Sequence, residues 1–304
     1  MNGHVFRLLS ADCAIYKVNK VAPVLMYKIL ALLAILIFHG LPVTAETLTF
    51  APLPMESTYT VASQWQPFVE YIEQKLGIKL KFSYTSTNNE IIMKFASGEL
   101  DLAYLGPLPY VKLKQIFPAA DPIVIFKEKD GGTTYTCALI SLAETNFDFT
   151  RVKTKRVALT QPLSTCGYFA GQGILAQHGS SIEDNFYQFL GQHDKVALAV
   201  ARGDFDIGVL KTSIAHKYNY MGVIVRAESP HMPGLAIVAN SNRVSPQRIT
   251  QIRQALLAAD EKTRQSWGEN IRYGVVPAKD SDYEGMRQLP MPLTFPNQGN
   301  IRTN

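Results

Sequence analysis

Residues 62–105 read ASQWQPFVEYIEQKLGIKLKFSYTSTNNEIIMKFASGELDLAYL, and this stretch alternates predicted helices with predicted strands. Over residues 62–76 the large apolar side chains recur at helical spacing, and a glycine follows as a stop signal. Residues 78–84 then alternate apolar and polar, as a half-buried strand does. A second helix over 88–98 and a short apolar strand over 100–105 complete the stretch. This order predicts an α/β fold in which helices cover a mostly parallel sheet.

The same alternation begins again in the second half of the chain. Strands are predicted over 156–160 and 205–210, and helices over 167–178 and 193–202. A chain of this length can bury two medium-sized cores. We therefore expect two lobes, each with a mostly parallel sheet covered by helices.

Three further segments have the composition of strands, and they are residues 135–141, 223–227 and 235–239. They lie between and after the two α/β sets, where they are placed to cross from one lobe to the other. Two crossing strands would form a hinge between the lobes.

The last predicted helix begins at Ser245, an N-cap that is followed by proline at the first helical position. We assign this helix to the first lobe. The expected division is therefore lobe 1 over residues 46–137 and 235–304, and lobe 2 over residues 138–234.

The first 45 residues have the features of an export signal. Residues 26–28 are a short charged region, residues 29–38 are apolar, and Val43-Thr44-Ala45 supplies a small-residue cleavage pattern. The apolar run is about ten residues, shorter than the ~20 that a membrane-spanning helix needs. We expect residues 1–45 to be a signal peptide with an N-terminal extension, cleavage near Ala45, and a periplasmic mature protein.

The charge balance excludes one class of partner. The whole chain has a formal charge of +5. Residues 1–45 contain four basic side chains and one acidic one, so 26 basic and 24 acidic side chains and a net charge of +2 remain. This excess is too small to indicate binding to nucleic acid.

Cofactor and metal sites have no sequence signal. The histidines at 178, 193, 216 and 231 lack the spacing of metal ligands, and no glycine-rich nucleotide loop is present. Cys137 and Cys166 remain after the signal, in a compartment that permits disulfides, but the sequence does not decide whether they pair.

The most informative segment for function is residues 160–168, TQPLSTCGY. It combines a strand end, a turn with proline, and hydroxyl side chains at the start of a helix. Free backbone N–H groups at a helix N-terminus attract anions, and the hydroxyls of Ser164 and Thr165 add donors. The alternative is that Ser164 merely caps the helix.

This segment resembles the Ser-Thr-Ser-Gly-Tyr signature of the phosphate/phosphite/phosphonate ABC transporter periplasmic binding proteins. Further matches follow in the same order along the chain. DLAYLGP at 101–107 resembles the first-lobe cleft loop of that family, and HDKVALAV at 193–200 with GDFD at 203–206 resembles its His-bearing helix and following Asp strand. SPHMPG at 229–234 resembles its second crossover. The similarity spans essentially the whole mature chain.

The resemblance implies a two-lobed type II periplasmic binding protein fold that closes on a small oxyanion. Tyr59 and Tyr104 would close over the ligand from the first lobe, whereas a surface tyrosine is the alternative for Tyr59. His193 would otherwise be an ordinary helix-start residue, and Asp206 is interpreted first as a hydrogen-bonded polar residue beside the cleft. The ligand-binding residues implied are Tyr59, Tyr104, Ser164, Thr165, Cys166, Gly167, His193 and Asp206.

Two positions bear on the ligand. Family members that bind aminoalkylphosphonates place acidic residues where this chain has Ser213 and Leu235. A buried ammonium without a carboxylate is costly, so phosphite, phosphate or methylphosphonate is preferred. Lys211 would add positive charge near the cleft, although a solvated lysine at a strand end is the preferred interpretation.

Cys166 replaces the third serine of the signature. A thiol at a helix N-terminus has a lowered pKa, and a thiolate would repel an anion. Three alternatives remain: Cys166 stays protonated, it is bridged to Cys137, or the ligand is an oxidised sulfur species that a thiol engages.

The expected function is capture of a small oxyanion by lobe closure and delivery to an ABC transporter permease, by a protein that works as a monomer. The alternative is a ligand sensor for another oxyanion that works with a membrane signalling partner. Catalysis by Cys166, His193 and Asp206 as nucleophile, base and orienter is disfavoured, because no second motif supplies an oxyanion hole. We expect no enzyme activity.

Overall fold

The computed structural model describes residues 45–55, 57–292 and 294–301. The export signal predicted for residues 1–45 lies almost entirely outside this range. Within the described residues, no helix combines the length and the apolar composition needed to cross a membrane.

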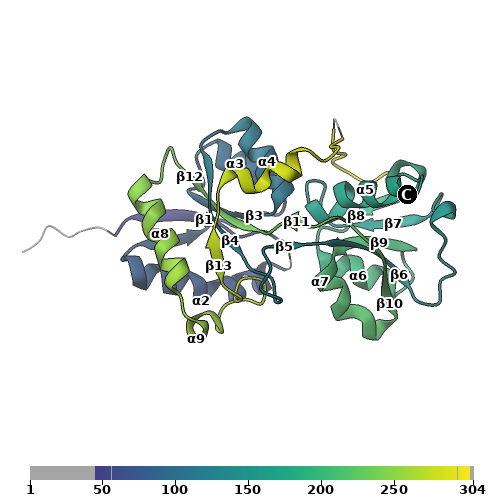
Figure 1. Ribbon diagram of the computed structural model, residues 1–304, viewed down its shortest axis with the longest axis horizontal. Helices are drawn as coiled ribbons and strands as arrows, with labels where there is room; N and C mark the ends of the chain where they lie inside the picture. The colour runs from purple at the N-terminus through teal and green to yellow at the C-terminus, as the bar shows by residue number, and fades with distance from the viewer. Residues whose placement is uncertain (1–44, 56, 293, 302–304) are drawn as a thin grey trace, which may run out of the picture. The chain divides into compact units, whose positions relative to one another are not determined.

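The larger sheet has six strands in the order β13-β4-β12-β3-β1-β2 (Figure 1). β1 pairs in parallel with β2 and β3, whereas β12 lies antiparallel between β3 and β4, and β13 is antiparallel to β4. The strands are β1 (Thr47–Ala51), β2 (Lys79–Phe82), β3 (Leu102–Leu105), β4 (Ala120–Phe126), β12 (Ala236–Asn240) and β13 (Val275–Pro277).

Helices cover both faces of this sheet. α2 (Thr58–Leu76) packs with α8 (Pro246–Ala258) on one face, and α3 (Asn88–Ala96) packs with α4 (Pro107–Ile116) on the other (Figure 1). α2 begins four residues earlier than predicted because Ser57 caps it, its side chain accepting a hydrogen bond from the Thr60 N–H. The last long helix, which we assign to the first lobe, contacts α2, β4 and β13.

The smaller sheet has five strands in the order β10-β6-β9-β7-β8. β7 pairs in parallel with β8 and β9, and β6 lies antiparallel between β9 and β10. α5 lies on one side of it, and α6 with α7 on the other (Figure 1). The elements are β6 (Cys137–Leu142), β7 (Arg156–Leu159), α5 (Ala170–Gln177), β8 (Phe186–Phe189), α6 (His193–Ala201), β9 (Ile207–Lys211), α7 (Thr212–Ala215) and β10 (Val223–Glu228).

Two short strands, β5 (Thr134–Tyr135) and β11 (Met232–Pro233), pair antiparallel and connect the two sheets. The prediction that residues 223–227 and 235–239 cross between the lobes is wrong. The first segment is the edge strand β10 of the smaller sheet, and the second belongs to β12 inside the larger sheet. The chain crosses first at β5, where the predicted segment 135–141 begins, and it returns at β11, which lies between the other two predicted segments.

Both sheets are mixed, so the expectation of mostly parallel sheets needs correction. A parallel neighbour requires a crossover connection of a dozen or more residues, usually a helix. The chain enters β12 directly from β11 and leaves β5 directly into β6, without a helix in either place. Because β4 leads out of the larger sheet to β5 and β12 returns into it from β11, these two neighbours run antiparallel, and the same holds for β6 and β10 in the smaller sheet.

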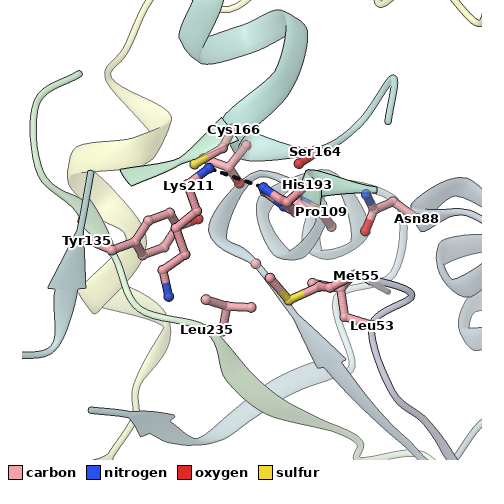
Figure 2. Close-up of a pocket in the computed structure, with 12 residues that line it drawn as sticks. Leu53, Met55, Asn88, Pro109, Tyr135, Ser164, Cys166, His193, Lys211 and Leu235 are labelled. Atoms are coloured by element: carbon pink, nitrogen blue, oxygen red, sulfur yellow. Dashed lines mark hydrogen bonds between the residues drawn. The ribbon is translucent and has the colours of Figure 1, made fainter. Parts of the chain in front are cut away.

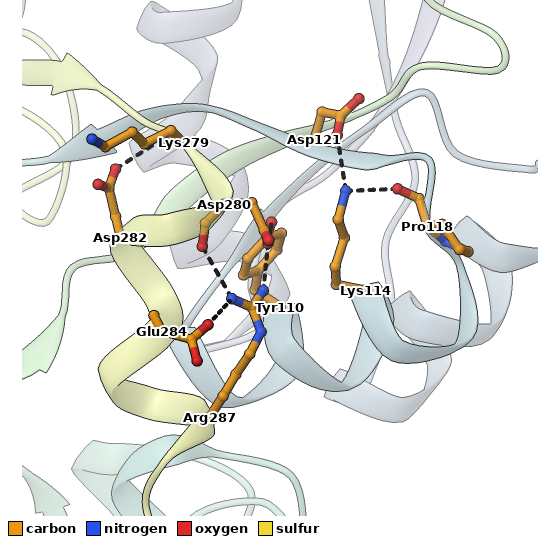
Figure 3. Close-up of polar contacts among 9 residues, drawn as sticks. All are labelled: Tyr110, Lys114, Pro118, Asp121, Lys279, Asp280, Asp282, Glu284 and Arg287. Atoms are coloured by element: carbon orange, nitrogen blue, oxygen red, sulfur yellow. Dashed lines mark hydrogen bonds and ion pairs between the residues drawn. The ribbon is translucent and has the colours of Figure 1, made fainter.

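The C-terminal segment is anchored to α4 (Figure 3). The Tyr110 hydroxyl on α4 donates a 2.5 Å hydrogen bond to Oδ1 of Asp280, and the guanidinium of Arg287 on α10 (Glu284–Arg287) pairs with the same carboxylate. Arg287 also reaches Glu284 at 3.1 Å. A further short helix, α9 (Glu261–Arg264), precedes β13.

The end of the described chain leaves the first lobe and contacts the second. The Phe295 ring lies near Lys112 of α4, with 5.4 Å between Nζ and the ring centroid, and near Tyr168 of the second lobe, at 6.3 Å between centroids. Asn300 then pairs with the edge of β8, where Oδ1 accepts the Tyr187 N–H at 2.7 Å and its own N–H donates to the Tyr187 carbonyl at 3.0 Å.

Candidate functional site

A cavity of about 30 Å³ lies where segments of both lobes meet (Figure 2). A water-sized group needs roughly 10–15 Å³ of such space, so the cavity fits only a small ligand. In Figure 2, Tyr135 and Lys211 lie on one side of it and Asn88 on the other. The lining residues are Leu53, Met55, Asn88, Gly106, Pro109, Tyr135, Ser164, Thr165, Cys166, His193, Lys211 and Leu235.

The N-termini of α3 and α4 point toward the second lobe. The Asn88 N–H donates to Oε1 of Gln161 at 2.8 Å, and the Leu108 N–H donates to Oγ1 of Thr165 at 3.1 Å. Oxygen atoms of the second lobe thus sit at the positive ends of two helices of the first lobe. These positions favour electron-rich oxygen ligands.

The loop before α5 contributes Ser164, Thr165 and Cys166 to the cavity wall. Ser164 occupies the N-cap position, but its side chain makes no capping hydrogen bond to any described residue. The capping interpretation of Ser164 is therefore wrong for its side chain, and its hydroxyl remains available at the cavity.

The backbone of this loop is kinked at Cys166 and Gly167, whose φ and ψ angles are not helical. The Thr160 hydroxyl stabilises the kink by donating to the Cys166 carbonyl at 2.8 Å. A β-carbon on Gly167 would lie 2.7 Å from Oγ1 of Thr160 and 3.0 Å from the Gln161 carbonyl oxygen. Only glycine fits there without a shift of its neighbours.

Cys137 and Cys166 form a disulfide, with their Cα atoms 5.1 Å apart. Of the three alternatives for Cys166, the structure has the bridged form. Both residues are buried, and Cys137 opens β6 directly after the crossing strand β5. The bond therefore ties the kinked loop to the hinge region and removes the free thiol from the cavity.

His193 is the first residue of α6 and is buried. Its Nδ1 accepts a 3.1 Å hydrogen bond from the backbone N–H of Lys211. Burial, together with the positive charge of Lys211, lowers the pKa of His193 from 6.5 to about 3. The ring is therefore neutral at physiological pH, and since Nδ1 is the acceptor, the proton is on Nε2, where it serves as a donor.

Lys211 is 3% exposed, so the expectation of a solvated lysine is wrong. Its ammonium group lies 2.7 Å from Oε1 of Glu128 and 5.0 Å from the ring centroid of Tyr135. Burial lowers the pKa of Lys211, and the neighbouring Glu128 carboxylate opposes that effect. The lysine is buried because an acid from the first lobe meets it.

Two of the predicted tyrosines do not line the cavity. Tyr59 lies at the start of α2 and is 84% exposed, so it is a surface tyrosine, as the alternative interpretation expected. Tyr104 is buried in the core of the first lobe, with its ring centroid 4.8 Å from that of Trp65 and 5.4 Å from that of Phe126.

The tyrosine at the cavity is Tyr135 on the crossing strand β5, which the sequence analysis did not select. Burial raises the pKa of its hydroxyl well above the usual value, so it stays protonated. A signal for it existed, because any residue on a crossing strand passes the junction of the lobes.

Asp206 lies before the first residue of β9, whereas Lys211 at the cavity is the last residue of that strand. Its carboxylate accepts the Arg156 N–H at 2.7 Å and pairs with the Arg156 guanidinium at 3.3 Å. The interpretation as a hydrogen-bonded polar residue agrees with these contacts. Its placement beside the cleft is wrong, because the strand carries it to the other end of the sheet.

Asn88 was also missed. It is 3% exposed, it lines the cavity, and its Oδ1 has no hydrogen-bond partner among the described residues. A buried polar atom without a partner is rare and requires an explanation. Its position at the start of a predicted helix was the available signal.

The side chains that line the cavity also indicate which ligands it can bind. Within residues 45–55, 57–292 and 294–301, no Asp or Glu side chain lines the cavity. The same residues contain no group of three or more His, Cys, Asp or Glu side chains able to hold a metal ion.

The family model described as "ABC transporter, phosphonate, periplasmic substrate-binding protein" matches residues 50–283. The chain belongs to this family. The predicted resemblance is thereby confirmed, and the family is one of periplasmic proteins that bind transporter substrates rather than catalyse reactions.

Curated relatives agree with this membership. The phosphate-import protein PhnD of Mycolicibacterium smegmatis is 26% identical over 273 residues, which cover 80% of this chain and 85% of the relative. The phosphonates-binding periplasmic protein of Escherichia coli is 28% identical over 216 residues, covering 65% of this chain and 62% of the relative.

Solved structures of the phosphonate-binding family share the fold. PhnD1 of Prochlorococcus marinus, in complex with methylphosphonate, superposes with a TM-score of 0.70 at 18% identity, covering 80% of this chain and 96% of that one. A binding component of a phosphonate transporter from Pseudomonas aeruginosa has a TM-score of 0.71 at 18% identity, with 81% and 86% covered. The predicted two-lobed type II periplasmic binding fold is confirmed.

Proposed function

We propose that the cavity binds a small phosphorus oxyanion, namely phosphite, phosphate or a short alkylphosphonate such as methylphosphonate, for uptake by an ABC transporter. One observation carries the proposal: neutral donors gather at the cavity without any described carboxylate. They include the Ser164 hydroxyl, Nε2 of His193 and the Tyr135 hydroxyl. Hydrogen bonds to an ionised acceptor are about twice as strong as neutral ones.

The helix N-termini support the same ligand class. The Leu108 N–H at the start of α4 donates to the Thr165 hydroxyl, and the Asn88 N–H at the start of α3 donates to Gln161. An oxyanion between the lobes would add acceptors to this region, where the partial positive charges of the helix ends favour them. From the predicted site, Ser164, Thr165, His193 and the loop backbone at Cys166 and Gly167 stay in the proposal.

The apolar part of the wall limits the substituent on phosphorus. Leu53, Met55 and Leu235 line the cavity, and they suit a P–H or P–CH₃ group better than a charged one. The relatives named for phosphate import and for a methylphosphonate complex fall within this range.

Capture would proceed by closure of the lobes, which we propose to span residues 46–137 with 235–304 and residues 138–234. Contacts between them include the bonds from α3 and α4 to the second lobe. The protein would act as a monomer after removal of a signal near Ala45, and it would deliver its ligand to a permease. The bond between Cys166 and Cys137 leaves Cys166 without a free thiol, so capture would not use it as a nucleophile.

A second proposal, a sensor of an oxidised sulfur species, has less support. The sensor hypothesis depends on a reactive thiol at Cys166, and the disulfide with Cys137 removes that thiol. The alkanesulfonate-binding protein SsuA of Xanthomonas axonopodis, with a TM-score of 0.56 at 16% identity, shares only the fold.

The test is calorimetric titration of the purified protein with phosphite, phosphate, methylphosphonate, sulfate and thiosulfate. One phosphorus oxyanion should bind in the micromolar range or tighter, and Ser164→Ala and His193→Ala should each weaken it about 10- to 100-fold. Tyr59→Phe, at an exposed position outside the cavity, is the matched control and should bind as the wild type does. Binding of thiosulfate alone would contradict the proposal.

A further inference from the structure

Lys211 separates the cavity from a second, outer pocket. Its side chain lines the cavity, and its ammonium group extends to Glu128, which lines the outer pocket of about 370 Å³. Ser213 lines that outer pocket as well. The lysine therefore lies between a small cavity without carboxylates and a larger pocket that is lined by two acids, Glu128 and Glu269.

The Lys211–Glu128 pair joins the two lobes. Lys211 ends β9 of the smaller sheet, and Glu128 follows β4 of the larger sheet. Their side chains are 4% and 19% exposed, and the N–O distance is 2.7 Å. A charge buried to this degree requires its partner, because removal of one member leaves the other uncompensated.

The ammonium of Lys211 has the chemistry of the amine on an aminoalkylphosphonate. It lies beside the cavity, it meets a carboxylate, and it lies over the ring of Tyr135. An ammonium beside a carboxylate and an aromatic face is the environment that a cationic ligand group needs. Here the protein supplies that group from its own chain.

We propose that Lys211 determines the selectivity of the cavity, because its ammonium group takes the place of a ligand-borne amine and neutralises Glu128. This inference deepens the proposed function and rests on it. A ligand that carries its own amine finds the space filled and no free carboxylate. Leu235 on the cavity wall offers no substitute counter-charge.

Truncation of Lys211 should reverse this selectivity. Lys211→Ala removes three methylene groups and the ammonium, while an aminoethyl substituent contains two methylene groups and an ammonium. The vacated space would connect the cavity with Glu128. A 2-aminoethylphosphonate molecule would then place its phosphonate at Ser164 and His193 and its amine at Glu128.

The experiment measures binding of methylphosphonate, 2-aminoethylphosphonate and propylphosphonate by calorimetry. Propylphosphonate is the matched ligand, since a methyl group replaces the ammonium at equal size. The wild type should bind methylphosphonate at least 100-fold more tightly than 2-aminoethylphosphonate. Lys211→Ala should bind 2-aminoethylphosphonate at least tenfold more tightly than propylphosphonate, and Lys211→Ala/Glu128→Gln should lose that preference.

Two further variants, with Glu269→Gln as their control, test the role of Lys211 without shortening its side chain to alanine. Lys211→Met keeps the space filled without a charge, so it should gain no affinity for 2-aminoethylphosphonate. Glu128→Gln leaves the lysine charge unpaired and should tighten methylphosphonate binding several-fold. Glu269 lines the same outer pocket and pairs with Lys217, so Glu269→Gln should leave methylphosphonate binding unchanged.

The outcomes of these binding measurements distinguish the proposed function from the proposed role of Lys211. A wild type that binds none of the phosphorus oxyanions overturns the proposed function. A wild type that binds methylphosphonate, combined with a folded Lys211→Ala variant without a preference for the amine, overturns only the role of Lys211. If the double variant still prefers 2-aminoethylphosphonate to propylphosphonate, the role of Lys211 is overturned as well, because the amine is then not bound by Glu128.

Discussion

The backbone N–H of Lys211 donates a 3.1 Å hydrogen bond to Nδ1 of His193. This single contact orients the imidazole ring, keeps Nδ1 free of a proton, and leaves the proton on Nε2. The strand that carries the buried lysine therefore also sets the tautomer of the histidine at the start of α6.

Stability should depend on pH through His193. Burial lowers the pKa of His193 to about 3 in the folded protein, so between pH 3 and 6.5 the unfolded chain binds a proton that the folded protein does not. The free energy of unfolding therefore rises with pH across this window, by up to ~1.4 kcal/mol per pH unit, and the contribution is lost as pH falls. Urea unfolding at pH 5 and pH 7 measures the difference. His193→Gln should reduce that difference by about 2 kcal/mol, and equal differences for the two proteins would contradict the prediction.

Gly167 should tolerate no side chain. The β-carbon of Gly167→Ala would meet Oγ1 of Thr160 at 2.7 Å, so we expect a loss of about 1–3 kcal/mol in unfolding free energy and weaker ligand binding. Gly173→Ala in α5 is the matched control, because nothing lies within 4 Å of its β-carbon. It should gain about 0.5–1 kcal/mol. Thermal unfolding of both variants checks the pair, and similar shifts in the same direction would show that crowding is not the cause.

The disulfide should contribute strongly to stability. A bridge between residues 29 positions apart restricts the unfolded chain, which corresponds to about 3–4 kcal/mol in the chain-entropy model. Denaturant unfolding of the wild type with and without reductant should reveal this loss. The variant Cys137→Ala/Cys166→Ser should show the lower stability in both conditions. If reductant destabilises the variant as much as the wild type, the prediction is wrong, because the loss of stability would not come from the disulfide.

The contact between Tyr110 and Asp280 should hold the C-terminal segment on α4. Tyr110→Phe removes a buried hydroxyl that donates to a carboxylate, at an expected cost of about 1.5–3 kcal/mol. Tyr59→Phe makes the same chemical change at an exposed position and should alter stability by less than about 0.5 kcal/mol. Chemical denaturation compares them, and equal effects would mean that the Asp280 bond contributes nothing.

Much of the fold could be predicted because helix and strand periodicity are local. The helix over residues 88–98 and the helix over 193–202 appear as α3 and α6 within two residues at each end. The strand directions were harder to predict, since β12 and β6 pair antiparallel because each enters its sheet from a crossing strand, which is a property of the whole topology.

The site was only partly predictable for the same reason. Ser164, Thr165 and His193 stand in recognisable local patterns, and all three line the cavity. Lys211 was misjudged because its burial depends on Glu128, 83 residues away. Asp206 was misplaced because a strand has two ends, and its local sequence does not say which one faces the ligand.

The segment that ends with Asn300 connects the two lobes at a third place, in addition to β5 and β11, and it is attached to the second lobe by hydrogen bonds. Two adjacent strands behave as a hinge that allows both bending and twisting, whereas a strap attached at a distance from them restricts twisting. Asn300 holds that strap to β8 through two bonds to Tyr187 and one to the Asn185 carbonyl at 2.8 Å. The lobes must therefore either rotate about this attachment as they open or break its hydrogen bonds to the edge of β8. The rate of ligand release would then depend in part on residues near the C-terminus, far from the hinge.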